Sequence, residues 1–416
     1  MTQKYTKVRG MHDILPLEIS KWQFVERVLT DTAKFYGYKE IRTPLVESRS
    51  LFERSIGSDT DIISKEIYAF KDRKGRDIAL RPEGTASVVR AFIESGMSVE
   101  KKVFRFYYYG PMFRYDRPQK GRYRQFYQFG VELIGSNHPF FDGEVVAMLH
   151  TIAEKLKLNG YKFLVNTLGC SNCKTKYSDI IKDYFSGRKN NLCNDCIKRI
   201  INSPLRILDC KNPGCKQSIS NAPLIGNILC NDCLYHFQKF QEYLKVNNVP
   251  YKVDPYLVRG LDYYTRTVFE LYVEGDENAI AAGGRYDNLI NQLGGPDIPA
   301  VGFAIGMERL ISLVEYNTPS EPLIYFACIG EEAKIKGTKI INELRKEGIT
   351  AETDYKEESL RSHLKTANRA GANWCIIIGE DEIKREEFIF KDMLSGKQIT
   401  IPFNNYIKRI KELLKC

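Results

Sequence analysis

The sequence lacks long apolar runs. No stretch approaches the roughly 18 uninterrupted apolar residues that suggest a membrane-spanning helix. The first residues, from Met1 to Tyr5, lead into no apolar segment and no small-residue cleavage site, so no secretory signal is expected. An internal repeat and a low-complexity tract are also missing. These absences predict a cytoplasmic protein without membrane association.

Acidic residues are the minority among the charges. The chain has 52 Asp and Glu against 62 Lys and Arg, which gives a formal net charge of +10. A basic balance suits a polyanionic partner such as RNA, although many soluble proteins carry it for no functional reason. The 416 residues, 43% of them hydrophobic, are enough for two or three packed domains.

Cysteine, by contrast, is abundant and clustered. Eight of the 11 cysteines fall between Cys170 and Cys233, and clustered cysteines in a cytoplasmic chain indicate metal ligands before disulfides. Two thiolates two residues apart suit one tetrahedral metal, and two such pairs complete a four-cysteine zinc site. The four pairs are Cys170 with Cys173, Cys193 with Cys196, Cys210 with Cys215, and Cys230 with Cys233.

Eight ligands predict two structural zinc sites, and the spacing leaves their pairing open. Sequential pairing would join the first two pairs and then the last two, while interleaved pairing is also possible. The alternatives to zinc are buried reduced thiols, or a module that keeps only one site. Cys328, Cys375 and Cys416 lie outside the set.

Hydrophobic periodicity separates an α+β part from a smaller α/β part. Up to about residue 320, segments with helical spacing alternate with β-rich aromatic stretches, which indicates helices and antiparallel hairpins rather than regular βαβ units. The expected helices are 18–36, 84–94 and 140–156; the expected strands are 66–70, 77–80, 102–113, 125–135, 267–273 and 278–282. A turn is expected at Gly283 and Gly284, and a long helix from about Ala304.

Two further segments complete this organisation. Residues 168–238 hold the cysteine pairs among scattered Asn and Pro, and they are interpreted as an inserted module. Residues 318–322 have the composition of a linker. Beyond it, 323–416 alternates strand and helix, which is typical of a small α/β domain with a partly parallel sheet.

Residues 105–132 combine arginines with aromatic residues. Arginine forks bind phosphate in a bidentate way and aromatic rings stack on bases, so this pattern favours a nucleotide or RNA site. The alternative is a solvated basic loop above core aromatics. The loop at its centre, 114–124, carries Arg114, Arg117, Lys120, Arg122 and Arg124.

A second group of residues is suited to hold a small polar ligand. Glu83 and Thr85 in the segment 80–85 join Gln128 and Glu132, which lie four residues apart in an expected strand and therefore share one face. Two carboxylates, an amide and a hydroxyl supply the acceptors that an ammonium group and an imidazole need. Alternatively, Glu83 caps the helix that starts near Gly84.

These segments resemble the class II aminoacyl-tRNA synthetases, and specifically the histidyl-tRNA synthetases. Residues 110–114 with 122–126 resemble their motif 2, and 302–309 (GFAIGMER) resembles motif 3. The segment 257–267 (LVRGLDYYTRT) resembles the histidine-specific signature peptide of that family, and it is the most specific match. Residues 9–13 and 35–44 resemble its opening and its motif 1, so the resemblance covers nearly the whole chain.

The resemblance implies roles for individual residues. Arg114 and Arg259 are expected to be catalytic through the α-phosphate of ATP. Histidine would be bound by Glu83 and Thr85 near its amino group, Glu132 at its imidazole, and Gln128, Arg259, Tyr263, Tyr264 and Tyr286 around them. ATP would be bound by Arg114, Arg122, Phe126 against the adenine, and Arg309 at the γ-phosphate.

The resemblance also implies a fold, a reaction and partners. A class II catalytic domain is expected over 1–320, with the insertion at 168–238 and an anticodon-binding domain over 323–416. Histidine's carboxylate would attack the ATP α-phosphate with Mg²⁺ on the phosphates, and the adenylate would be transferred to tRNA-His. Motif 1 implies a homodimer. The alternatives are a non-catalytic, histidine-sensing regulatory subunit of ATP phosphoribosyltransferase and a zinc-ribbon protein that binds nucleic acid.

Overall fold

The computed structural model describes residues 5–57, 60–100, 102–119, 121–276, 278–316, 322–354, 356 and 359–414. The chain forms two compact units, residues 1–316 and 317–416. Lys120, Cys416 and all of the expected linker except Pro322 lie outside the described residues. Within the described part, no helix combines the length and apolar character needed to cross a membrane.

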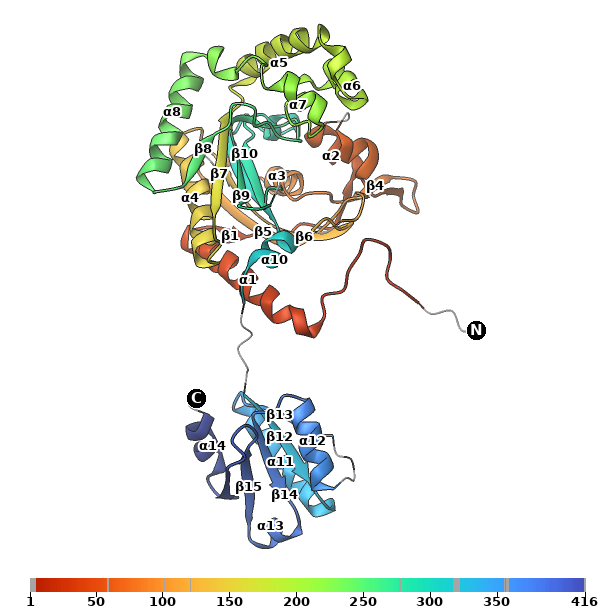
Figure 1. The fold of residues 1–416 in the computed structure, drawn as a ribbon, viewed down its shortest axis with the longest axis vertical. Helices are drawn as coiled ribbons and strands as arrows, with labels where there is room; N and C mark the ends of the chain where they lie inside the picture. Colours follow the sequence, from red (N-terminus) through yellow and green to blue (C-terminus); the bar gives the residue numbers. More distant parts are fainter. Residues whose placement is uncertain are drawn as a thin grey trace. The chain divides into compact units, whose positions relative to one another are not determined.

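The first unit is built on one eight-stranded sheet (Figure 1). Its central strands run antiparallel, and only the two edge pairs, β1 with β5 and β7 with β8, are parallel. The strand order is β1 (Lys39–Glu40), β5 (Phe104–Phe113), β6 (Gln125–Ile134), β11 (Ala300–Gly306), β10 (Ala281–Arg285), β9 (Thr265–Val273), β7 (Tyr161–Thr167) and β8 (Tyr251–Val253). The predicted α+β fold with an antiparallel sheet flanked by helices is confirmed.

Helices cover one face of this sheet and form its main core. Trp22, Val25 and Leu29 recur at helical spacing along α1 (Pro16–Phe35), so one stripe of this helix is buried. They pack with α4 (Pro139–Lys155) and α8 (Asn231–Val246) over side chains that alternate along β5 and β6. The alternating partners on these strands point to the opposite face, which carries α3 (Thr85–Glu94) and the functional residues.

Two expectations about local structure are wrong. Gly283 and Gly284 form no turn but lie within β10, and Ala304 lies in β11 rather than at a helix start. The helix that follows, α10 (Met307–Leu313), is short. The glycines reflect crowding inside the sheet, because a Cβ on Gly283 would lie 2.2 Å from the carbonyl oxygen of Gly302.

A small three-stranded sheet stands beside the main one. The strands β3 (Ala69–Lys71) and β4 (Asp77–Leu80) pair antiparallel, which confirms the predicted hairpin, and β2 (Val46–Ser48) pairs with β4. Gly75 has a φ of 78° in the hairpin turn, a conformation that favours glycine. The helix α2 (Arg49–Ile56) and a π-helical turn, η1 (Ile62–Glu66), lie next to it in the chain.

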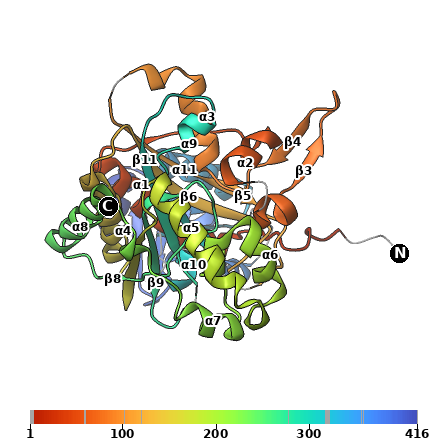
Figure 2. The same ribbon diagram turned by 90° about the horizontal axis from the view of Figure 1, so that it is seen from above.

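The cysteine-rich module is helical (Figure 2). Short helices separate the ligand pairs, and Cys170, Cys193 and Cys230 each stand directly before a helix. The elements are α5 (Ser171–Ser186), η3 (Lys189–Asn191), α6 (Asn194–Asn202), η4 (Pro204–Ile207), α7 (Pro213–Ile219), η5 (Ile225–Asn227) and α8. Its core residues join those under α3 and the signature peptide in one cluster.

The second unit has a five-stranded sheet that is partly parallel, as expected. Its order is β13 (Thr350–Glu352), β12 (Leu323–Cys328), β14 (Trp374–Ile378), β15 (Glu387–Asp392) and β16 (Gln398–Pro402). The first three strands are parallel, and the last two, which were not predicted, are antiparallel. Its helices are α11 (Glu331–Lys346), α12 (Leu360–Arg369), α13 (Glu380–Lys384) and α14 (Tyr406–Leu414).

Candidate functional site

One cavity of about 480 Å³ lies on the face of the main sheet that α1 leaves open. Its walls come from β6, β10, β11, the start of α3, the signature peptide and the loop after β5. All twelve residues assigned from the sequence to histidine, ATP or catalysis line it: Glu83, Thr85, Arg114, Arg122, Phe126, Gln128, Glu132, Arg259, Tyr263, Tyr264, Tyr286 and Arg309. The cavity therefore joins segments that are far apart in the sequence.

A buried carboxylate marks the polar end of the cavity. Glu132 is 1% exposed, and it accepts hydrogen bonds from the hydroxyl of Thr85, at 2.7 Å, and from the hydroxyl of Tyr286. Burial raises the pKa of Glu132 from its ordinary value of 4.5 to about 8, although both hydroxyl bonds favour the carboxylate. A ligand that brings an N–H donor or a positive charge would relieve this cost.

The raised pKa of Glu132 predicts a pH-dependent effect on stability. The folded state holds the proton up to about pH 8 while the unfolded chain releases it near 4.5, so ionisation destabilises the fold as pH rises through this window. Glu132→Gln keeps the shape without the charge. We expect the free energy of unfolding of this variant, measured by urea denaturation, to exceed that of the wild type by an amount that grows from pH 5 to 8 and then levels off. A difference that does not change with pH would contradict the raised pKa of Glu132.

Glu83 caps a helix and also lines the cavity. Its two carboxylate oxygens accept the backbone N–H groups of Thr85, at 2.7 Å, and Ala86, at 2.8 Å, so it caps α3 and neutralises the positive end of that helix. It also lines the cavity beside Gln128, whose buried Oε1 accepts no hydrogen bond within the described part of the chain. An acceptor in this position is available to a donor from a ligand or from water.

The floor of this polar end depends on a glycine. A Cβ at Gly302 would lie 2.1 Å from Oε2 of Glu132 and 2.3 Å from the carbonyl oxygen of Val131. Both of these neighbours belong to β6, which pairs with β11 at this point. Glycine at this position therefore lets the Glu132 side chain lie flat across the sheet.

The other end of the cavity carries the cationic groups. Arg114 donates from Nε to the carbonyl oxygen of Pro82 at 2.8 Å, and its guanidinium carbon lies 5.4 Å from the centre of the Phe126 ring. Arg309 donates to the carbonyl oxygen of Ala279 at 2.9 Å, and Arg122 pairs with Asp116 at 3.1 Å. Burial lowers the pKa of Arg114 and of Arg309, which means that desolvation leaves both cations short of counter-charge.

Arg259 lies on the signature peptide and is paired with a carboxylate that the sequence did not indicate. Its Nη1 donates to Glu270 of β9, which also accepts the hydroxyl of Tyr272 at 2.5 Å. The Nε of Arg259 is buried and has no partner among the described residues. The peptide is held by Asn166, whose side chain donates to the carbonyl oxygen of Leu257 at 3.0 Å.

Several cavity residues were missed. Glu308 accepts the backbone N–H of Tyr127 at 2.8 Å, and burial raises the pKa of Glu308 to about 7. It lies next to Arg309 in motif 3, so the motif itself could have pointed to it. Asp61, Glu66 and Arg206 also line the cavity, but they come from segments without any recognisable motif.

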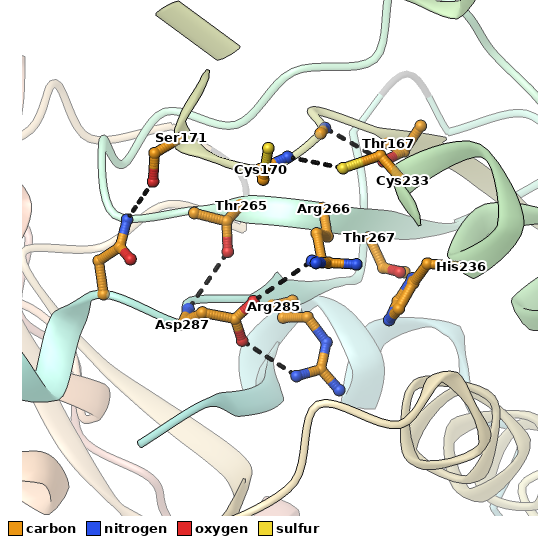
Figure 3. Close-up of polar contacts among 12 residues, drawn as sticks. Thr167, Cys170, Ser171, Cys233, His236, Thr265, Arg266, Thr267, Arg285 and Asp287 are labelled. Atoms are coloured by element: carbon orange, nitrogen blue, oxygen red, sulfur yellow. Dashed lines mark hydrogen bonds and ion pairs between the residues drawn. The ribbon is translucent and has the colours of Figure 1, made fainter. Parts of the chain in front are cut away.

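A buried ion pair joins the end of β10 to α4. Arg285 and Asp142 are both fully buried and joined through two guanidinium nitrogens, and Asp142 also accepts the hydroxyl of Thr267 at 2.5 Å. Figure 3 shows Arg266 and Arg285 meeting at Asp287 below Cys170 and Cys233. This network fixes the end of β10, directly before Tyr286.

The eight clustered cysteines form two groups of four. One holds Cys170, Cys173, Cys230 and Cys233, which we call the outer cluster; the other holds Cys193, Cys196, Cys210 and Cys215, the inner cluster. In each group all four sulfurs lie within 4.8 Å of one another. The pairing is therefore nested, neither sequential nor interleaved, because the module folds back so that its first and last ligand pairs meet.

Both clusters have the geometry of a tetrahedral metal site. A metal–sulfur distance of about 2.3 Å puts the sulfurs about 3.8 Å apart. The Sγ atoms of Cys170 and Cys173 are 3.7 Å apart, and those of Cys193 and Cys210 are 3.8 Å apart. Backbone N–H groups of Cys170 and Cys193 donate to cysteine sulfurs at 3.1 and 3.2 Å, which supports the thiolate form. Four cysteines so placed fit zinc.

Comparisons with known proteins agree with one another. A sequence model described as "Histidyl-tRNA synthetase" matches residues 10–172 and 219–310, and a model described as "Anticodon binding domain" matches 324–413. Histidine–tRNA ligases of Thermodesulfovibrio yellowstonii and Halothermothrix orenii are 48% and 46% identical to this chain, each over 98% of it and over 98% and 99% of their own lengths.

A solved structure extends this similarity to the fold. The crystal structure of apo histidyl-tRNA synthetase from S. aureus superposes with a TM-score of 0.83 at 35% identity, and the match covers 98% of this chain and all of that one. The cysteine-rich segment 173–218 falls outside the matched family model. Full-length similarity to these relatives shows that the chain belongs to the histidyl-tRNA synthetase family.

Proposed function

We propose that this protein activates histidine with ATP and esterifies it onto the 3′ end of tRNA-His. The observation that carries the proposal is the single cavity in which an acceptor-rich end, around Glu132, meets a cationic end, around Arg114. An amino acid and a nucleoside triphosphate need these two environments side by side, so that the carboxylate of the amino acid can attack the triphosphate.

The acceptor-rich end suits histidine. The imidazole would donate to Glu132, whose raised pKa favours a ligand that brings a donor, and the ring would lie among Tyr263, Tyr264 and Tyr286. The centres of the Tyr263 and Tyr264 rings are 4.7 Å apart, so they form one aromatic wall. The α-ammonium group would be bound by Glu83 with Gln128 and Thr85.

The cationic end suits the phosphates. Histidine's carboxylate attacks the α-phosphorus, and pyrophosphate leaves, so negative charge grows on the α-phosphate in the transition state. Arg114 and Arg259 would neutralise that charge, while Arg122 and Arg309 bind the departing phosphates and Phe126 stacks on the adenine. No side-chain nucleophile or base is required, because the attacking carboxylate is already ionised. Catalysis rests on positioning and on charge stabilisation.

Mg²⁺ and zinc have separate places in this proposal. Mg²⁺ prefers oxygen ligands, supplied mainly by the ATP phosphates, and the carboxylate of Glu308 lines the cavity at that end. The bound Mg²⁺ would neutralise negative charge on the leaving pyrophosphate. The two cysteine clusters would each bind one structural Zn²⁺, because four converging thiolates and no open position describe a structural site.

The domain organisation and the partners are proposed by analogy with the family. Residues 1–320 would form the catalytic domain, interrupted by the insertion at 168–238. Residues 323–416 would bind the anticodon of tRNA-His, which the match of 324–413 to an anticodon-binding domain supports. The protein would act in the cytoplasm as a homodimer through motif 1, with the basic loop 114–124 reaching the acceptor end of the tRNA.

The regulatory alternative is not favoured. An ATP phosphoribosyltransferase regulatory subunit/histidyl-tRNA synthetase from Bacillus halodurans shares the fold, with a TM-score of 0.66 at 21% identity over 88% of this chain. At that identity the likeness concerns the fold alone. All twelve expected site residues line one cavity here, and a C-terminal unit of the anticodon-binding family is present.

Histidine-dependent ATP–pyrophosphate exchange tests the proposal. Purified, metal-replete protein should catalyse exchange with histidine and with no other amino acid of a full panel, because only an imidazole can satisfy both Glu132 and the tyrosine wall. Charging of tRNA-His transcripts should follow. Folded protein that binds histidine tightly but catalyses no exchange would instead support the regulatory alternative.

A further inference from the structure

The inner cysteine cluster encloses a short segment that reaches the catalytic cavity. Cys196 lies in the first turn of α6 and Cys210 follows η4, and the stretch between these two ligands carries Arg199 and Arg206. Arg206 lines the cavity described above. A metal that holds the two ends of this stretch would therefore fix the position of both arginines.

Both arginines converge on one carboxylate of the cavity wall. Nη2 of Arg206 lies 3.2 Å from Oδ2 of Asp61, and Nη2 of Arg199 lies 3.4 Å from the same oxygen. The arginine side chains are 17% and 25% exposed, so these pairs are better shielded than ordinary surface ion pairs. Lys65 occupies the other oxygen of Asp61 at 3.0 Å.

Asp61 stands immediately before the π-helical turn η1, which forms part of the cavity wall. Asp61, Ile62 and Glu66 all line the cavity. At the far end of the turn, the carbonyl oxygen of Glu66 accepts the backbone N–H of Tyr115 at 2.6 Å, next to Arg114. The π-helix is an uncommon conformation that depends on its surroundings for stability. The arginine contacts are the surroundings at its N-terminal end.

We propose that a metal ion in the inner cluster controls the shape of the ATP site through Arg206 and Asp61. The ion would hold α6 and η4, Arg206 would hold Asp61, and Asp61 would hold residues 61–66 against the loop that carries Arg114. Arg206 is thus a positioning residue that acts through Asp61. This inference rests on the proposed function for its kinetic consequence, but its structural part does not depend on the reaction.

The structural part is tested by hydrogen–deuterium exchange on the substrate-free protein. Arg206→Gln should increase exchange of the amides of 61–66 while zinc content, measured by mass spectrometry, stays at the wild-type value. Cys210→Ser should lose the inner metal and increase exchange over the same residues. Arg188→Gln is the matched control, because Arg188 belongs to the same module and its side chain donates to the carbonyl oxygen of Tyr184 and stacks on the ring of that residue. Unchanged exchange of 61–66 in Arg206→Gln would overturn the proposal, even if Cys210→Ser fails to fold.

The kinetic part separates positioning from direct contact with substrate. Loss of one charge-assisted contact predicts that Arg206→Gln raises the KM for ATP about tenfold and changes kcat and the KM for histidine little. Because Arg206 acts through Asp61, the double variant Arg206→Gln/Asp61→Asn should be no worse than the poorer single variant. Multiplied effects would show that Arg206 binds substrate directly and would overturn the positioning role. Absence of any exchange activity in the wild type would refute the proposed function and leave the deuterium result standing.

Discussion

Arg259→Ala is expected to lower kcat for histidine-dependent pyrophosphate exchange by about 10²- to 10³-fold, because one preorganised donor to the developing charge is lost. The loss should exceed that of an ordinary truncation, since Glu270 then remains in the site without its partner. The buried carboxylate of Glu270 accepts from Arg259 and Tyr272. Once uncovered, it would face the α-phosphate with a like charge.

A second substitution separates these two contributions. If the uncovered carboxylate adds to the defect, Arg259→Ala/Glu270→Gln should recover part of the activity that Arg259→Ala loses, while Glu270→Gln alone stays active. Arg73→Ala, at the exposed tip of the β3–β4 hairpin, controls for removal of a positive charge. Steady-state exchange rates at saturating histidine and ATP give the comparison. A kcat of Arg259→Ala within twofold of the wild-type value would show that Arg259 does not stabilise the transition state.

Asp142→Ala is expected to destabilise the first unit by about 3–5 kcal/mol, because it removes the fully buried partner of the Arg285 guanidinium and leaves Arg285 with Asp287, a carboxylate that it shares with Arg266. Neither side chain of this pair is exposed. Thr267 would lose its acceptor at the same time. His236, whose Nε2 lies 3.5 Å from Asp142, cannot supply the missing negative charge, because an imidazole is either neutral or cationic; burial lowers the pKa of His236 to about 4, so its ring is neutral near pH 7.

Urea unfolding followed by circular dichroism measures this loss. The matched control is Glu242→Ala, which breaks the exposed pair with Lys239 on α8 and should change stability by less than about 1 kcal/mol. The double variant Asp142→Leu/Arg285→Met should recover much of the loss, because an apolar pair carries no desolvated charge. If Asp142→Ala lowers the free energy of unfolding by less than about 1 kcal/mol, Arg285 does not depend on Asp142 for its burial.

The helices and strands that could be predicted from the sequence are those whose hydrophobic pattern depends only on neighbouring positions in the chain. The stripe of Trp22, Val25 and Leu29 predicts α1 because its burial follows from helical spacing alone. The same holds for the strands and helices of the second unit up to β14. The pattern misled at Gly283 and Ala304, where the crowding that requires glycine comes from neighbouring strands in the sheet. The close contact with Gly302 exists only once β10 and β11 pair.

The candidate site divides in the same way. Motifs brought Glu132, Arg114 and Arg259 forward, and the fold places them in one cavity. Glu270, the partner of Arg259, and Asp61, the partner of Arg206, could not be predicted, because neither carries a motif and each meets its arginine only through tertiary packing. The nested pairing of the cysteines also depends on how α5 to α8 fold back, which the spacing of the ligands does not contain.

Nesting gives the two clusters an order of assembly. Cys193 and Cys215 of the inner cluster are 22 residues apart, whereas Cys170 and Cys233 of the outer cluster are 63 residues apart. The entropic cost of closing the inner loop is therefore about 1 kcal/mol smaller than that of closing the outer loop. Closing it also shortens the free chain that the outer cluster must span. During synthesis the last inner ligand emerges before the last outer one. If both clusters bind metal, this order of loop closure predicts that the inner cluster is occupied before the outer one.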